Sequence, residues 1–203
     1  MFRKFLKKNL FNLISRITTS YETQQSFNKS EVLKKSLKSS KDFFIEGHYK
    51  IVNPQYISFG NGFHSLWNLR IEAVDNYRGQ QFFPEIVIGS NVQFHSDIHI
   101  GAINKVVIGN NVLLASRIYI SDHVHGEINS NDLDKIPADR MITSKGPVII
   151  EDNVWIGEGV SILAGVTIGK NAIVGANSVV NKSIPANCVA AGVPARVIKK
   201  LDN

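Results

Sequence analysis

The chain has 203 residues, 43% of them hydrophobic, which fits one globular unit with a single core. The only cysteine, Cys188, excludes a disulfide within the chain. The formal net charge is +6, but no nucleic-acid-recognition motif accompanies the basic residues, so we expect no nucleic-acid partner.

The N-terminal segment differs from the rest in charge and pattern. Residues 1–41 carry ten Lys or Arg and only two Glu. Apolar residues at helical spacing predict a helix over residues 1–20, and the polar stretch 21–41 predicts a linker or a second short helix. No apolar run is long enough to span a membrane, and no secretory signal core is evident. We therefore predict a cytoplasmic protein whose basic N-terminus is either a solvated face or a peripheral contact with the inner membrane face.

From about Phe43 onward the composition turns to β-branched and aromatic residues with Gly-Asn punctuation. Near the C-terminus an aliphatic residue recurs every six positions, at Ile150, Ile156, Ile162, Ile168, Val174 and Val180. Neither a helix, with period 3.6, nor a strand, with period 2, has this period. It is typical of a coil whose short flat faces stack on one another.

The same register extends toward the N-terminus. It predicts five turns of three faces each, with these inward residues: Phe59, Ser65, Ile71; Ile88, Phe94, Ile100; Ile108, Leu114, Ile120; Ile150, Ile156, Ile162; Ile168, Val174, Val180. Gly-Asn and Asn-Asn pairs such as Gly60-Asn61 and Asn110-Asn111 are expected at corners that need positive φ. Residues 76–85 and 122–147 interrupt the register, and the longer insertion is predicted to be a functional loop.

The stretch Val154–Lys200 reads VWIGEGVSILAGVTIGKNAIVGANSVVNKSIPANCVAAGVPARVIKK. It resembles the hexapeptide-repeat acyltransferases, closest in pattern to the galactoside, maltose and capsular or O-antigen polysaccharide O-acetyltransferases. The resemblance implies a left-handed parallel β-helix, a homotrimer, and acetyl-CoA bound in the cleft between subunits. It divides the chain into an N-terminal helical and linker segment, 1–42, and a β-helix acyltransferase domain, 43–203, with a loop excursion at 122–147 and a C-terminal tail at 184–203.

In the resembled enzymes a histidine that opens the long loop is the general base. The corresponding text here is SDHVHG, so we assign His123 to this role and His125 as the second candidate. Neutral imidazole can take a proton from a sugar hydroxyl near neutral pH. Adjacent side chains on extended chain point to opposite faces, so we expect a backbone carbonyl, rather than Asp122, to orient the ring. His95 stands where the sugar acetyltransferases tend to carry an acceptor-binding Asn, and it is a candidate acceptor contact.

The resemblance also implies a coenzyme groove. Trp155 is an outward residue that either packs at a trimer interface or forms an apolar wall against the pantetheine arm or the acceptor sugar. Gly157, Gly175 and Ala176 correspond to small positions along the groove. Lys182, Arg196 and Lys199 match basic positions that would meet the coenzyme phosphates.

The sequence thus predicts an O-acetyltransferase that moves an acetyl group from acetyl-CoA to a hydroxyl of a bacterial surface glycan or its precursor. One alternative is an N-acetyltransferase acting on a nucleotide-linked amino sugar. A distant alternative is a zinc hydratase resembling the γ-carbonic anhydrases, which needs three converging histidines; we expect no metal. Charged residues in the 122–147 loop are also compatible with an anionic acceptor, such as an acidic glycan.

Overall fold

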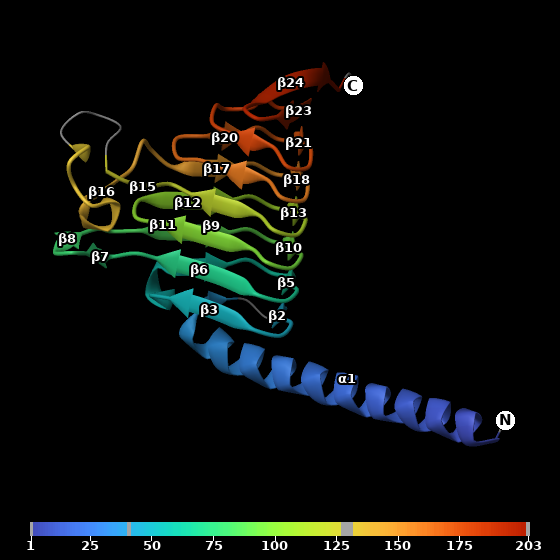
Figure 1. The fold of residues 1–203 in the computed structure, drawn as a ribbon. Coiled ribbons are helices and arrows are strands. Elements are labelled where there is room, and N and C mark those ends of the chain that lie inside the picture. The colour runs from blue at the N-terminus through green and yellow to red at the C-terminus, as the bar shows by residue number, and fades with distance from the viewer. Residues whose placement is uncertain (1, 40–41, 127–131, 202–203) are drawn as a thin grey trace.

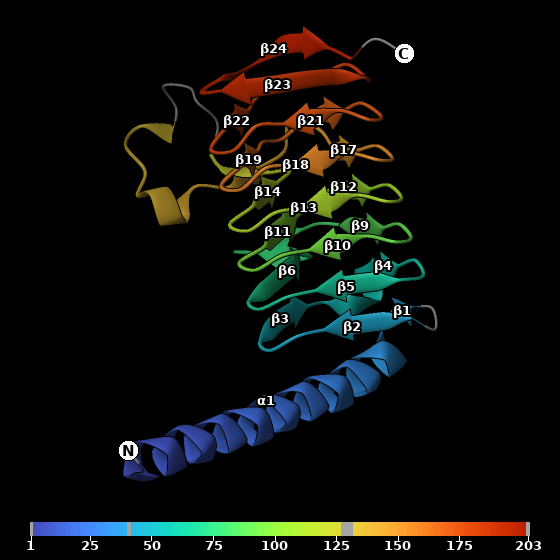
Figure 2. The same ribbon diagram turned by 90° about the vertical axis from the view of Figure 1, so that its right-hand side faces the viewer.

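A computed structural model describes residues 2–39, 42–126 and 132–201. A long N-terminal helix, α1 (Phe2–Ser36), is followed by a coil of short parallel strands stacked one above another (Figures 1 and 2). Parts of the predicted linker (40–41), the predicted loop (127–131) and the C-terminal tail (202–203) lie outside the described residues. No helix in the described ranges has the length and apolar character needed to cross a membrane.

The coil has three sheets, one for each of its faces. Sheet A contains β1 (Lys38–Ser39), β4 (Ile57–Phe59), β9 (Glu85–Ile88), β12 (Lys105–Ile108), β17 (Val148–Ile150) and β20 (Thr167–Ile168). Sheet B contains β2 (Phe43–Ile45), β5 (Phe63–Ser65), β10 (Gln93–Phe94), β13 (Leu113–Leu114), β18 (Trp155–Ile156), β21 (Ile173–Val174), β23 (Cys188–Gly192) and β24 (Ala195–Lys200). Sheet C contains β3 (Tyr49–Val52), β6 (Leu69–Ala73), β11 (His99–Ala102), β14 (Tyr119–Ser121), β19 (Ser161–Ile162) and β22 (Val179–Val180).

The strand pairing confirms the predicted register. On sheet C, for example, Ile71 pairs with Ile100 and Ile100 with Ile120. On sheet A, Ile108 pairs with Ile150 across the long loop. One further turn, β1 to β3, precedes the predicted first turn, so the coil begins at Lys38, before the expected residue 43.

The core is the column of inward side chains, which the stacking removes from water. Ile100, Ile120 and Leu114 have no exposed surface. Burial of such apolar surface is the main favourable contribution to folding. At one row of corners, Asn91, Asn111, Asn153, Asn171 and Asn187 adopt positive φ. Their side-chain amides form a ladder, each donating to the next at 2.7 to 3.1 Å. In the first predicted corner, the residue with positive φ is Gly62 rather than Gly60 or Asn61.

Helix α1 differs from the prediction, because a single helix replaces the short helix and linker expected before residue 41. Its C-terminal part covers the edge of the first turn. The buried Ser30 hydroxyl accepts a hydrogen bond from the Ile45 backbone N–H at 3.0 Å, and the buried Ser26 hydroxyl accepts one from Gly47 at 2.9 Å. These serines satisfy backbone donors at a sheet edge that would otherwise stay open for further pairing. Leu13, Ile14 and Ile17 lie farther toward the N-terminus and stay more than half exposed.

The two insertions fold into hairpins that contact each other. The first carries β7 (Asn76–Tyr77) and β8 (Gln80–Gln81); the second carries β15 (Val124–His125) and β16 (Ile142–Thr143). Both lie on the same side of the stack (Figure 1). The Tyr77 hydroxyl donates to the Ala138 carbonyl at 2.7 Å, and the Gln80 side chain accepts a hydrogen bond from Ile142 N–H at 3.1 Å. The longer insertion is therefore held over sheet C by the shorter one.

Candidate active site

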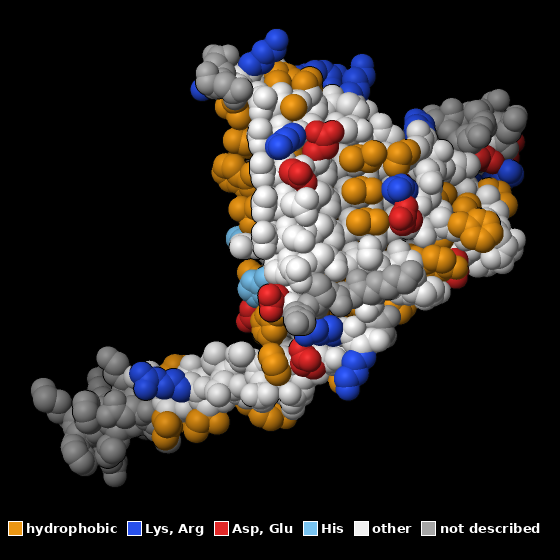
Figure 3. All heavy atoms as spheres, turned by 180° about the vertical axis from the view of Figure 1, so that it is seen from behind, with side chains coloured by type: hydrophobic (Ala, Val, Ile, Leu, Met, Phe, Trp, Pro, Cys, Tyr) orange, Lys and Arg blue, Asp and Glu red, His pale blue; other side chains and the backbone are white. Residues whose placement is uncertain are grey.

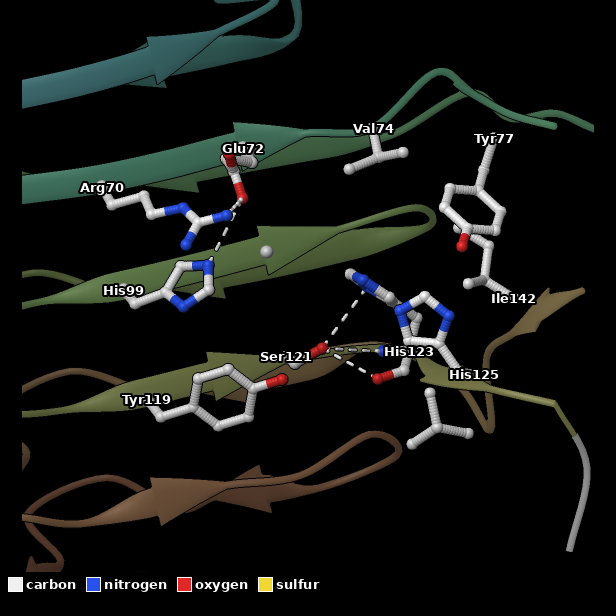
Figure 4. Close-up of a pocket in the computed structure, with 12 residues that line it drawn as sticks. Arg70, Glu72, Val74, Tyr77, His99, Tyr119, Ser121, His123, His125 and Ile142 are labelled. Carbon is white, nitrogen blue, oxygen red and sulfur yellow. Dashed lines mark hydrogen bonds and ion pairs between the residues drawn. The ribbon is translucent and has the colours of Figure 1, made fainter. Parts of the chain in front are cut away.

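A pocket of about 530 Å³ lies where sheet C meets the two hairpins (Figure 4). Sheet C supplies its floor and one wall, and the hairpins supply the opposite wall. The lining residues are Arg70, Glu72, Val74, Tyr77, His99, Gly101, Tyr119, Ser121, His123, Val124, His125 and Ile142. The predicted general base and the second candidate thus face one cavity.

His123 is oriented by its own neighbours in the chain. Its Nδ1 lies 3.0 Å from Oδ1 of Asp122 and 3.3 Å from the Ser121 hydroxyl. The expectation that a backbone carbonyl would hold the ring was wrong, because the chain turns out of sheet C here and the two side chains no longer point to opposite faces. The imidazole is 17% exposed, and the Asp122 side chain is fully buried.

Asp122 also fastens the adjacent corner of the coil. Its carboxylate accepts hydrogen bonds from the backbone N–H groups of Ile103, Asn104 and Lys105 at 2.9, 2.8 and 2.7 Å. A buried carboxylate needs such partners to offset its desolvation. Three backbone N–H groups fix this carboxylate, and the carboxylate in turn holds Nδ1 of His123, so the position of the ring is set before any substrate binds.

Gly101 provides the space for the imidazole. A Cβ atom at Gly101 would lie 3.1 Å from Cε1 of His123, closer than an ordinary van der Waals contact. Gly101 pairs with Glu72 on one side and with Ser121 on the other. The missing side chain therefore leaves a hollow in the outer face of sheet C, between Glu72 and His123.

A charged cluster forms the far wall of the hollow. Burial raises the pKa of Glu72, but hydrogen bonds and positive charge from Arg70 and Lys50 outweigh this and lower the pKa to about 2. Burial and the nearby Arg70 charge lower the pKa of His99, and the opposing effect of Glu72 is smaller. Glu72 is thus a carboxylate and His99 a neutral imidazole at neutral pH.

The other predicted histidines lie apart from this arrangement. His125 lines the hairpin side of the pocket, with its ring 5.3 Å from that of Tyr77. His95 is exposed at the corner between sheets B and C and does not line the pocket. No three His, Cys, Asp or Glu side chains in the described part of the chain lie close enough together to hold a metal ion.

The predicted coenzyme residues lie on other parts of the coil. Trp155 is half exposed on sheet B, in register with Leu113, Ile173 and Val189. This sheet carries a column of apolar side chains along one edge of the molecule (Figure 3). Ala176, Lys182, Arg196 and Lys199 are exposed on the last turns and the tail. Within one chain, none of these residues lines the His123 pocket.

Gly157 and Gly175 have a packing reason to be glycine. A Cβ at Gly157 would come within 2.7 Å of the Ala176 backbone nitrogen, and one at Gly175 within 2.9 Å of the Ala191 side chain. Real Cβ atoms do not approach other atoms so closely. Substitution of either glycine would therefore disturb the stacking whether or not a ligand binds there.

The sequence analysis did not single out Gly101, Glu72, Arg70 or Tyr119. The register could have found two of them, Arg70 and Tyr119, because each precedes an inward isoleucine by one position and pairs with His99 on sheet C. Tyr77 belongs to the short insertion, and nothing in the sequence indicates that this insertion contacts the loop at 122–147.

Residues 147–182 match the family described as bacterial transferase hexapeptide (six repeats). The chain is 42% identical over 156 residues to the putative lipopolysaccharide biosynthesis O-acetyl transferase WbbJ of Escherichia coli K12, covering 75% of this chain and 76% of that protein. It is 34% identical over 190 residues to the galactoside O-acetyltransferase of the same strain, covering 92% and 77%.

Among solved structures, the N-acyltransferase AntD from Bacillus cereus, in complex with dTDP and 3-hydroxybutyryl-CoA, superposes with a TM-score of 0.69 at 23% identity. The match covers 86% of this chain and 88% of that one. At this identity the likeness concerns the fold alone. Together with the stacked parallel sheets, it confirms the predicted left-handed parallel β-helix.

Proposed function

The chain belongs to the hexapeptide-repeat acetyltransferase family, and we propose that it transfers the acetyl group of acetyl-CoA to a hydroxyl of a bacterial surface glycan, or of its precursor, with His123 as the general base. One observation carries the proposal: His123 is locked by Asp122 at the edge of a pocket large enough for a sugar. The relative that is named as a lipopolysaccharide O-acetyl transferase supports the glycan acceptor.

The geometry assigns a task to each nitrogen of His123. When Nδ1 carries the ring proton, it donates to Asp122 Oδ1, which leaves the Nε2 lone pair for the acceptor. Acetyl-CoA supplies an acetyl thioester. Nε2 takes the proton of the acceptor hydroxyl while that oxygen bonds to the acetyl carbon and the C–S bond breaks. The proton then passes to the departing thiolate, and free thiol is the product to be measured.

The working unit is a homotrimer in this proposal, with the groove completed by a second subunit. The outward column formed by Leu113, Trp155, Ile173 and Val189 supports it, because Trp155 is half exposed, the other three are partly exposed, and a contiguous apolar surface of this kind marks an interaction site. Trp155 of one subunit would then face the pocket of its neighbour. Ala176, Lys182, Arg196 and Lys199 would line the coenzyme path, with the basic side chains near its phosphates. Sedimentation velocity should give a particle of about three times 22.5 kDa.

Helix α1 is proposed as the contact with the inner face of the cytoplasmic membrane. Residues 1–21 hold five Lys or Arg and no acidic residue. The exposed Leu13, Ile14 and Ile17 belong to the N-terminal half of the helix, which projects beyond the coil (Figure 2). Such helices bind anionic interfaces through apolar burial and charge together. Co-sedimentation with anionic but not zwitterionic vesicles would support this, and equal recovery with both would contradict it.

The reaction is tested by thiol release from acetyl-CoA with a panel of acceptors: neutral methyl glycosides, de-O-acetylated lipopolysaccharide oligosaccharides, sialic acid polymers and nucleotide amino sugars. The proposal expects turnover with a neutral glycan, and mass spectrometry with mild alkali treatment should show an alkali-labile ester. An alkali-stable amide on the amino sugar would instead establish the N-acetyltransferase alternative.

A further inference from the structure

The spacing of the strands sets the distance between the backbone positions on either side of Gly101. Glu72, Gly101 and Ser121 occupy the same outward position on the adjacent strands β6, β11 and β14. Neighbouring strands are about 4.8 Å apart, so the backbone positions of Glu72 and Ser121 are separated by roughly 10 Å. His123 follows Ser121 and reaches back over Gly101. Glu72 and His123 line the same pocket, and its volume of about 530 Å³ is large enough for a sugar ring that contacts both side chains.

Glu72 is held rigidly at the far side of this space. Lys50 donates to its Oε1 at 2.8 Å, and Arg70 contacts its Oε2 at 2.6 Å. Nε2 of His99 is 3.5 Å from the same Oε2. A carboxylate offers about four lone-pair positions, so hydrogen-bond acceptor capacity is left on an oriented group that is only 15% exposed. This side chain faces the pocket that contains His123 (Figure 4).

The side walls match the apolar faces of a sugar. The rings of His99 and Tyr119 pack edge to face at 5.3 Å along one side, and Tyr119 stays 39% exposed. Val74 and Tyr77 form the opposite side. An aromatic ring can cover the C–H face of a pyranose, while polar groups at the two ends form hydrogen bonds with its hydroxyls.

We infer that Glu72 is a specificity-determining residue: it accepts hydrogen bonds from hydroxyls on the side of the sugar ring opposite the hydroxyl that His123 deprotonates. Because the ionised Glu72 carboxylate can only accept hydrogen bonds, it favours a sugar that presents hydroxyl donors to it and disfavours one that places a carboxylate in direct contact with it. This inference rests on the proposed acetyl transfer and extends it to the class of acceptor.

The test compares Glu72→Gln with the unaltered protein, using as probe the methyl hexopyranoside that is acetylated best and its monodeoxy derivatives. The variant should lose about 10- to 100-fold in kcat/KM for the sugar, the usual cost of a lost hydrogen bond to a charged group, with KM for acetyl-CoA unchanged. One deoxy derivative should show the same loss with the unaltered protein and no further loss with the variant. Glu72→Asp keeps the charge but withdraws it by one methylene, and it should show an intermediate loss.

Glu85→Gln is the matched control. Glu85 is ion-paired with Lys105 at 2.7 Å, as Glu72 is with Lys50, but it lies on sheet A and does not line the pocket. This variant should keep both kinetic constants. The methyl uronide corresponding to the best sugar should be a poor acceptor for the unaltered protein and a better one for Glu72→Gln.

Two results would overturn the inference in distinguishable ways. If the unaltered protein acetylates the sugar and His123→Ala does not, but Glu72→Gln matches the unaltered protein for every deoxy derivative, then Glu72 has no part in recognition and the proposed reaction stands. If no sugar of any class is acetylated, the proposed reaction and the inference fail together. A direct readout is sugar binding to His123→Ala by saturation-transfer NMR, which should weaken when Glu72→Gln is added.

Discussion

The C-terminal turns of the coil and the turns that carry the pocket share one hexad register but differ at a single corner. From position 150 to position 168, the chain returns to sheet A after 18 residues. It takes 29 residues from position 59 to 88, and 42 from position 108 to 150. Both long returns leave sheet C at the same corner, and their hairpins meet over His123.

The two kinds of turn therefore contribute differently: the inward residues of every turn stabilise the fold, and the irregular turns also supply the residues around the pocket. The regular turns bury aliphatic side chains, and the outward residues of their strands are apolar or carry a hydroxyl group, such as Trp155, Ser161 and Ile173. The irregular turns keep the same column of inward side chains but place Glu72, Gly101 and His123 around the pocket, with the buried Asp122 behind His123. We therefore expect core substitutions to change the free energy of unfolding and corner substitutions to change turnover.

The largest expected effect on folding comes from Leu114→Ala. Leu114 is fully buried in the middle of the column, and its truncation should reduce the free energy of unfolding by about 2–5 kcal/mol. Denaturant unfolding at fixed protein concentration measures this, and the activity of the folded fraction should survive. Leu133→Ala, in the exposed part of the long loop, is the control and should change stability little. Equal losses in the free energy of unfolding of Leu114→Ala and Leu133→Ala would contradict the assignment of stability to the buried column.

Asp122→Asn should affect both properties, because this side chain belongs to the corner and to the site. An amide offers fewer acceptor positions for the three backbone donors, so we expect a loss of about 1–3 kcal/mol in stability. It also loses the carboxylate that fixes the His123 tautomer, so kcat should fall at least about 10-fold. Asp97→Asn, which alters an exposed carboxylate bonded to Asn68, is the comparison. An unchanged kcat in Asp122→Asn would show that Asp122 does not position His123 for catalysis.

Gly101→Ala should change turnover more than stability. The added methyl group would meet His123 Cε1 at 3.1 Å and displace the ring by a few tenths of an ångström. Small misplacement of a catalytic group is costly, so we expect about a 10-fold loss in kcat/KM with less than about 1 kcal/mol lost in stability. Steady-state kinetics and thermal melting measure the two effects. A variant with full activity would show that the hollow does not set the ring position.

The smallest expected effect is the pH dependence contributed by Glu72. Its pKa is lowered from 4.5 to about 2 in the folded protein, so its stabilising contribution is complete above about pH 4.5 and is lost as the pH falls toward 2. Glu72→Gln should therefore be less stable than the unaltered protein at pH 7, by about 1 kcal/mol, and the gap should narrow between pH 4.5 and 2. A gap that stays constant over this range would contradict the assigned pKa.

The sequence was sufficient for most of the architecture because the six-residue period recurs in the five predicted turns. Inward positions such as Ile71, Ile100 and Ile120 were all predicted, and they pair as expected. The extra first turn was missed because Ser39, Ile45 and Ile51 do not form a uniform aliphatic hexad. The single long helix was missed because its contact with the coil depends largely on the hydroxyls of Ser26 and Ser30, with Leu33 as an apolar contact, and not on a continuous apolar stripe.

Prediction of the site was limited by long-range contacts. His123 and His125 were found because they open the loop, and both line the pocket. The role of Asp122 depends on how the chain leaves sheet C, which a rule for extended strands does not describe. The contact of Gln80 with Ile142 joins residues 62 positions apart, and no local pattern specifies it.

The central claim is that His123 removes the acceptor proton. The most direct measurement is kcat for His123→Ala beside His125→Ala, each with the affinity for acetyl-CoA determined by calorimetry. We expect His123→Ala to lower kcat by about 10²- to 10⁴-fold and to keep coenzyme affinity, whereas kcat of His125→Ala should stay within about 10-fold of the unaltered protein. Full turnover by His123→Ala, or loss of activity confined to His125→Ala, would contradict it.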